Sequence, residues 1–75
     1  MGDRPFDSLN EAIGNVVIIK LKDNKKIRGK LKAFDVHMNV VLEDAEEIKS
    51  DGNTRYGTLI VRGDNIIFIS PGNRE

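Results

Sequence analysis

The sequence predicts a mainly β fold, in which a short N-terminal helix precedes a strongly bent, five-stranded antiparallel small barrel. Three observations support this prediction. Apolar side chains recur at helical spacing near the N-terminus, five short β-branched runs separated by turn residues follow, and Gly29 interrupts the apolar face of the second run. Short strands with a bend in the second suit a small curved barrel better than a flat sheet.

A helix is expected over about residues 5–13. Proline is favoured at the first helical position, where Pro5 stands, and glycine commonly ends a helix, as Gly14 would here. Between them, three apolar residues recur at the spacing that places side chains on one helix face: Phe6, Leu9 and Ile13. The predicted helix is therefore short and amphipathic.

The barrel is expected over about residues 16–70. In the first strand, residues 16–22, apolar side chains alternate with lysines, and the following Asp23 and Asn24 are typical turn residues. The second strand, about residues 25–34, places three side chains on its buried face: Ile27, Leu31 and Ala33. Gly29 lies on the same face, where a missing side chain permits a sharp bend or a close backbone approach.

Three further strands complete the prediction. The third is expected to place Val36, Met38, Val40 and Leu42 on one face and His37, Asn39, Val41 and Glu43 on the other. A polar connection follows over residues 46–55. The fourth strand is expected at about residues 56–61 and the fifth at about residues 65–70.

Length and composition limit the possible functions. At 75 residues there is room for one domain, expected over residues 1–75, with frayed tails at residues 1–4 and 73–75. The chain has no Cys and a single His, so we expect no disulfide, no metal and no cofactor. The apolar run at residues 16–19 is far shorter than the ~20 residues that span a membrane, and no signal-peptide pattern is present. A soluble, cytoplasmic protein without a membrane partner is expected.

The formal net charge of zero conceals two blocks of opposite charge. Residues 20–32 contain seven bases and the single acid Asp23, whereas residues 43–51 contain five acids and the single base Lys49. Separate basic and acidic surfaces would make a nucleic-acid partner compatible with overall neutrality. Alternatively, each block is only the solvated face of a hairpin, because Lys-rich strands also prevent edge pairing.

Polar residues interrupt the apolar strands at residues 35–39 and 61–65. His37 and Asn39 stand two residues apart, as do Arg62 and Asp64, and such residues on an extended chain point to the same side. Imidazole and guanidinium groups offer flat faces on which an unpaired base can stack, and an Asn amide can both donate and accept hydrogen bonds. Gly63 would let the backbone come close to a base. These positions are the candidate binding residues.

The apolar pattern of the last two predicted strands indicates that the chain assembles into an oligomer. The runs at residues 59–61 and 66–69 are apolar on both faces, so their edges would aggregate unless they were paired. If the fourth strand paired with the fifth strand of a neighbouring copy, both edges would be satisfied in a head-to-tail contact. Such contacts close into rings when the rotation between neighbouring copies permits. This argument leaves the number of subunits open.

Two spaced motifs carry a resemblance to a known family. The first contains Ile27-x-Gly29-x-Leu31 and then Phe34-Asp35-x-His37-Met38-Asn39, and the second spans Val61-Arg62-Gly63-Asp64-Asn65-Ile66. In this order the motifs resemble those of archaeal Sm-like (LSm) proteins, of the Sm ribonucleoprotein family. The resemblance covers nearly all of the chain, from Arg4-Pro5 to about Pro71.

The resemblance implies a homo-oligomeric ring, usually a heptamer, that binds uridine-rich single-stranded RNA around its inner rim. It also implies a role in RNA processing or ribonucleoprotein assembly, with other RNA-processing proteins as possible partners. The family's base-binding positions are matched by His37, Asn39, Arg62 and Asp64, and its intervening glycine by Gly63. Asp64 would orient Asn39 or Arg62.

A second RNA contact on the helix face would involve Arg4 and Phe34. Structural alternatives remain for the main site. A lone His on a strand is most often a partly buried polar group, and exposed Arg62 and Asp64 would only neutralise each other, for under ~1 kcal/mol. Asp35 is expected to tie its turn to nearby backbone N–H groups.

Two other classes of function remain as alternatives for this sequence. An enzyme would need a nucleophile with a base or a metal cluster, and the one His has only Asp35 and Asp64 as nearby carboxylates, so no enzymatic activity is expected. A protein-interaction scaffold of the small-barrel type, with RNA binding secondary, would need an aromatic groove. The chain supplies four aromatic residues for it: Phe6, Phe34, Tyr56 and Phe68.

Overall fold

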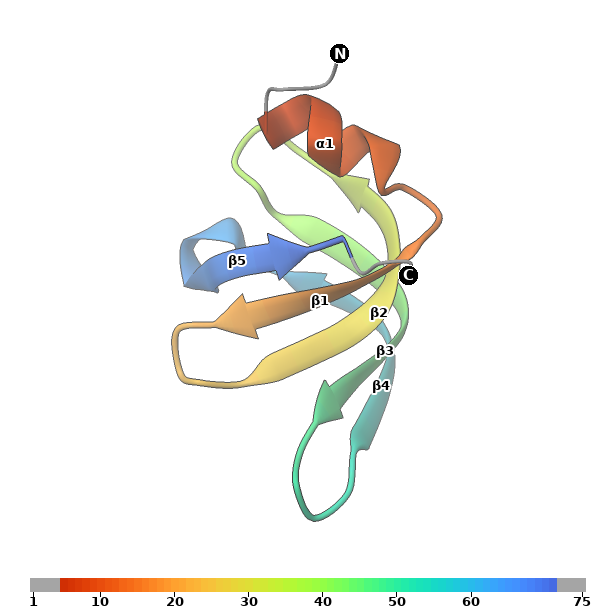
Figure 1. Cartoon of the computed structure of the whole chain (residues 1–75), viewed down its shortest axis with the longest axis vertical. Helices are drawn as coiled ribbons and strands as arrows, with labels where there is room; N and C mark the ends of the chain where they lie inside the picture. Colours follow the sequence, from red (N-terminus) through yellow and green to blue (C-terminus); the bar gives the residue numbers. More distant parts are fainter. Residues whose placement is uncertain (1–4, 72–75) are drawn as a thin grey trace.

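The computed structural model describes residues 5–71, which form one α-helix and one five-stranded antiparallel sheet (Figure 1). The predicted fold class is confirmed. The elements in chain order are α1 (Pro5–Glu11), β1 (Val16–Leu21), β2 (Lys26–Phe34), β3 (Val40–Ile48), β4 (Thr54–Val61), the short 3-10 helix η1 (Gly63–Asn65) and β5 (Ile66–Ser70). The expected tails and Arg4 lie outside the described residues.

Helix α1 ends two residues before its predicted limit. Ala12–Gly14 form a turn in which Gly14 has a φ of 88° and donates its backbone N–H to the carbonyl of Leu31 at 2.8 Å. Glycine adopts this left-handed conformation without steric cost. Ile13, expected on the apolar helix face, therefore lies exposed in the turn, and Leu9 is the buried residue of α1.

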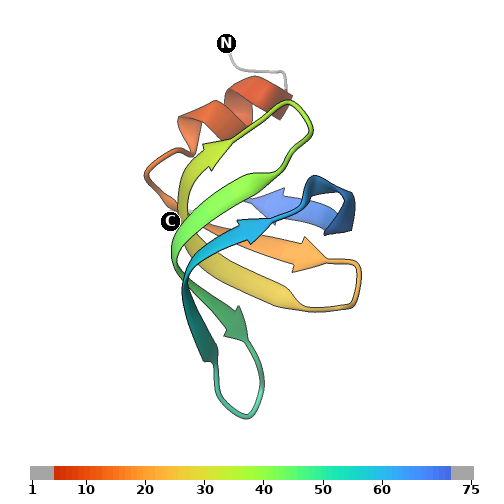
Figure 2. The same ribbon diagram turned by 180° about the vertical axis from the view of Figure 1, so that it is seen from behind.

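The sheet curls because its central strands are bent. The strand order β4-β3-β2-β1-β5 makes β2 and β3, each nine residues long, neighbours in the middle. Register shifts interrupt their pairing between Arg28 and Lys30 and between Leu31 and Ala33. Such bulges bend a strand and increase its twist. Both views show the resulting curvature, with the β3–β4 hairpin projecting from one end (Figures 1 and 2).

Gly29 permits the close approach that was expected of it. A Cβ atom there would lie 3.1 Å from both the Cα of Ala45 and the Cβ of Leu42 on β3. The prediction that Ala33 lies on the buried face of β2 is wrong, because Ala33 is exposed. The register shift that precedes Ala33 reverses the alternation of faces.

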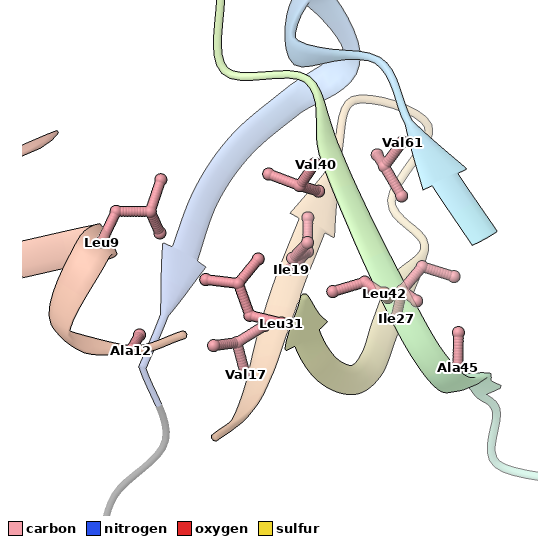
Figure 3. Close-up of a cluster of buried hydrophobic side chains, with 10 residues drawn as sticks. All are labelled: Leu9, Ala12, Val17, Ile19, Ile27, Leu31, Val40, Leu42, Ala45 and Val61. Carbon is pink, nitrogen blue, oxygen red and sulfur yellow. The ribbon is translucent and has the colours of Figure 1, made fainter. Parts of the chain in front are cut away.

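The core lies on the concave side of the sheet and beneath α1 (Figure 3). Burying each large aliphatic side chain contributes about 1.5–3 kcal/mol, so this cluster is the main source of stability. The buried apolar residues are Leu9, Ala12, Val17, Ile19, Ile27, Leu31, Val40, Leu42, Ala45 and Val61.

The basic and acidic blocks lie on adjacent strands, not on separate surfaces. Arg28 of β2 pairs with Glu46 of β3, and the Nζ of Lys32 lies 2.9 Å from the Oε2 of Glu43. The hydrogen bond from Arg28 holds the pKa of Glu46 below its ordinary value, and the one from Lys32 does the same for Glu43. The two blocks therefore neutralise each other in part across β2 and β3.

Replacing Gly29 with Val is expected to lower the free energy of unfolding by about 1–3 kcal/mol, because the added atoms overpack the contact between β2 and β3. Denaturant titration measures this change. Ala33→Val on the same strand is the matched control, since Ala33 is exposed. Equal losses from the two substitutions would contradict the close approach at Gly29.

Candidate functional site

The two polar segments singled out from the sequence lie in connections between strands. Residues 35–39 join β2 to β3, and Arg62 with η1 joins β4 to β5. Both connections lie on the same side of the sheet (Figure 2). The predicted strand through Val36 and Met38 is wrong, because Met38 has a φ of 64° and Val36 is 74% exposed. His37 and Asn39 thus share no strand face and are positioned by turn geometry.

Asp35 organises the first turn. Its Oδ1 accepts hydrogen bonds from the backbone N–H groups of His37 (2.9 Å) and Asn39 (3.1 Å), which confirms the expected turn-tying role. Its Oδ2 also accepts a hydrogen bond from the Asn39 side-chain amide at 3.2 Å. Met38 packs against the core as expected and anchors the turn. The carboxylate of Asp35 therefore fixes the orientation of the Asn39 amide.

One hydrogen bond joins the two connections. The backbone N–H of Gly63 donates to the Oδ1 of Asn39 at 2.8 Å. The approach is so close that a Cβ at Gly63 would overlap the carbonyl oxygen of His37 and lie 2.8 Å from the carbonyl carbon of Met38. Any residue other than glycine would separate the two turns. Gly63 is therefore required by packing between the turns.

The joined turns surround an open hollow of about 550 Å³. Its lining includes all five residues predicted for the main site, together with Met38: His37, Asn39, Arg62, Gly63 and Asp64. The imidazole of His37 is exposed and forms no hydrogen bond or ion pair with any residue between 5 and 71. Two groups with flat faces, the His37 imidazole and the Arg62 guanidinium, thus border one hollow.

Asp64 supports Arg62 and not Asn39. Its Oδ2 lies 3.7 Å from the Nη2 of Arg62, and the side chains are 69% and 75% exposed, so the ion pair stabilises the fold very little. The orienting role that was expected of Asp64 toward Asn39 belongs to Asp35. Asp35 is not among the site residues that the sequence predicts, although an Asp followed four residues later by an Asn in a turn is a usable signal.

The Asn39 amide retains part of its hydrogen-bonding capacity. Its oxygen accepts from Gly63 and one of its N–H groups donates to Asp35. An Asn amide has two N–H donors and an oxygen with two lone pairs. One N–H donor and one acceptor lone pair therefore remain for a planar ligand that carries the complementary groups.

Phe34 lies in a neighbouring hollow of about 500 Å³ that also touches Asn39 and Arg62. Its ring meets that of Phe6 edge to face, with centroids 4.9 Å apart and an interplanar angle of 77°. Of the two residues predicted for the contact on the helix face, the structure therefore describes only Phe34. Arg4 lies outside the described residues.

Comparison with known proteins assigns the fold and the motifs to a family. The family model described as the LSM domain matches residues 7–71. The chain belongs to the LSM domain family. An LSM relative from Methanococcoides burtonii, described as snRNP Sm-like, is 48% identical over 73 residues, which are 95% of this chain and 100% of the relative.

Solved LSM structures agree with this fold. The P. aerophilum SmAP1 heptamer superposes with a TM-score of 0.89 at 46% identity and covers 93% of this chain and 95% of its own. The Pyrococcus abyssii Sm protein in complex with a uridine heptamer gives a TM-score of 0.88 at 41% identity, over 93% and 100% of the respective chains.

Among residues 5–71, no three His, Cys, Asp or Glu side chains converge as metal ligands would. The helix described in this span is too short to cross a bilayer.

Lowering the pH is expected to loosen the first turn. The pKa of Asp35 is lowered mainly by the hydrogen bond from the Asn39 amide, and the backbone N–H groups of Asn39 and His37 add to this effect. A depressed pKa in the folded state stabilises the fold above the unfolded pKa, and this stabilisation is lost as pH falls through the folded pKa. As the pH falls, the backbone amide resonances of His37 and Asn39 should therefore shift together, with a midpoint below 3.8, the ordinary pKa of an Asp side chain.

NMR titration of the amide resonances checks this prediction. Asp35→Asn should remove the joint shift, and Asp51→Asn, in the exposed β3–β4 turn, should leave it unchanged. A midpoint at or above 3.8 would contradict the hydrogen-bonded arrangement of Asp35.

Proposed function

We propose that this protein binds uridine-rich single-stranded RNA in repeated pockets on the inner rim of a homoheptameric ring, and acts in RNA processing or ribonucleoprotein assembly. The observation that carries the proposal is the hydrogen bond between Gly63 and Asn39, which holds His37 and Arg62 at one hollow. The heptamer of P. aerophilum SmAP1 and the uridine heptamer bound to the P. abyssii protein support it.

The pocket chemistry suits uracil. The base would stack between the His37 imidazole and the Arg62 guanidinium, an interaction worth about 1–3 kcal/mol per base. The free N–H donor and acceptor lone pair of Asn39 match the carbonyl acceptor and N–H donor that lie next to each other on uracil. Cytosine presents an amino donor where uracil has the carbonyl, so the fixed Asn39 amide would favour uracil. Asp64 would steady the Arg62 side chain.

The edge strands support the ring. β4 and β5 are the two edges of the sheet, and three of their large apolar side chains are at least half exposed: Ile60, Ile67 and Phe68. An apolar hollow of about 480 Å³ lies along β5, between α1 and η1. Pairing of β4 with the β5 of a neighbour would cover these edges head to tail. Identical pockets at fixed spacing would then raise RNA affinity by about 10²–10⁴ through avidity.

Further parts of the proposal concern the whole chain. Residues 1–75 would form a single domain of this family, without enzymatic activity, and its RNA ligand would be met in the cytoplasm. Phe34, with Arg4, would provide a secondary RNA contact near α1. Support for this contact is the position of Phe34 in a hollow that also touches Asn39 and Arg62.

The alternative role as a protein-interaction scaffold has less support. An aromatic groove would need neighbouring rings, but Phe6 and Phe34 pack on each other. The hydroxyl of Tyr56 donates to the Oε1 of Glu47 at 3.0 Å on the β3–β4 hairpin, away from that pair. The described aromatic residues are thus spread over different parts of the fold.

Replacing either wall of the pocket is expected to weaken oligouridine binding without changing assembly. His37→Ala and Arg62→Ala should each raise the Kd for a uridine heptamer by roughly tenfold or more, because each removes about 1–3 kcal/mol of stacking per base. Fluorescence anisotropy measures the affinity, and native mass spectrometry measures the number of subunits.

Arg55→Ala is the matched control, since Arg55 is an exposed arginine at the opposite end of β4. Arg55→Ala should lower the net charge by as much as Arg62→Ala does and leave the affinity for the uridine heptamer nearly unchanged. If both His37→Ala and Arg62→Ala bind the uridine heptamer with wild-type affinity, the assignment of the pocket is wrong. If the wild-type protein is monomeric, the proposed ring is wrong.

A further inference from the structure

Two lysines face each other on the outer surface of the sheet. Lys20 of β1 and Lys26 of β2 are direct partners in the antiparallel register. Their chain neighbours Ile19 and Ile27 are also partners, and both are buried in the core, so Lys20 and Lys26 lie on the opposite face. Like charges directly opposite each other destabilise a sheet. This arrangement therefore needs an explanation.

No acid relieves the repulsion along this row of the sheet. On its other side, Lys20 pairs with Phe68 of β5. Lys26 pairs on its other side with Ile48 of β3. Within residues 5–71, neither lysine forms an ion pair, whereas Arg28 and Lys32 on the same strand each have a glutamate partner. Lys20 and Lys26 thus belong to the part of the basic block that forms no ion pair with β3.

The two lysines lie apart from the hollow between the two turns, because neither Lys20 nor Lys26 lines it. Basic side chains attract the phosphates of a single-stranded nucleic acid whatever its base sequence. RNA can therefore contact these lysines without competing for the site between the turns.

We propose that Lys20 and Lys26, the outer lysine patch, bind the sugar-phosphate backbone of single-stranded RNA that continues beyond the uridine pockets. The inference rests on the proposed function, because it concerns a second part of the same RNA. A phosphate placed between Lys20 and Lys26 converts their repulsion into two attractive interactions. Since interactions with the backbone carry no base preference, the patch lengthens the bound RNA without changing the uridine preference of the pockets.

The test compares a uridine heptamer with the same heptamer carrying an adenosine tail of about twenty nucleotides. In the wild type, the tail should increase affinity at low salt. The Lys20→Gln/Lys26→Gln variant should bind the heptamer as the wild type does, and its gain from the tail should be about five- to tenfold smaller. Its salt dependence should become shallower by about 0.7 in log–log slope for each phosphate that the variant no longer neutralises.

Lys25→Gln/Lys49→Gln is the matched control, because it removes the same charge from two turn-side positions. An undiminished gain from the tail, or an equal reduction in this control, would overturn the patch. Native mass and the thermal unfolding midpoint verify that the variants fold. If the double variant does not fold, the single variant Lys26→Gln replaces it in the same measurements.

Failure of the proposed function is distinguishable from failure of the patch. If the wild type does not bind the uridine heptamer, the pocket is wrong, and the adenosine strand alone still tests the patch. Equal affinity of wild type and Lys20→Gln/Lys26→Gln for that strand would overturn the patch independently.

Discussion

A short link between the two outermost strands constrains the whole fold. β4 and β5 stand at opposite edges of the five-stranded sheet, yet residues 62–65 alone connect them, and Gly63–Asn65 are wound into a 3-10 helix. A flat sheet would place these edges about 19 Å apart at the usual strand spacing of about 4.8 Å. A 3-10 helix advances only about 2 Å per residue, so the sheet must curl until its edges approach. The close approach at Gly29 and the register shifts in β2 make this curvature possible.

The candidate site follows from the same constraint. Curling brings the β4–β5 link against the β2–β3 turn, where Asn39 accepts a hydrogen bond from Gly63 and is itself held by Asp35. A continuous chain of hydrogen bonds therefore runs from one carboxylate through an amide to a backbone N–H. His37 and Arg62 are exposed and line the same hollow, with their flat groups available to a ligand.

The spacing of apolar residues was sufficient to predict the helix, the number of strands and most of the core, although β3 continues to Ile48 and β4 begins at Thr54, inside the predicted polar connection. It failed where the backbone leaves regular geometry, because a register shift exposes Ala33 and a turn carries Val36–Asn39. The candidate site residues were selected through their chemistry and motif spacing, although the shared strand face invoked for them does not exist. The role of Asp35 toward Asn39 and the pairing of Arg28 with Glu46 depend on turn geometry and strand register, which composition does not specify.

Both turns that form the hollow belong to one chain, and this has a consequence for stoichiometry. Because Asn39 and Gly63 meet within a subunit, a ring of such subunits holds one complete pocket per chain. A defective copy mixed into a ring would delete its own pocket and leave its neighbours intact. Occupancy would then decline in single steps with the number of defective copies, and the assembly would tolerate mixtures that an interface-shared site would not.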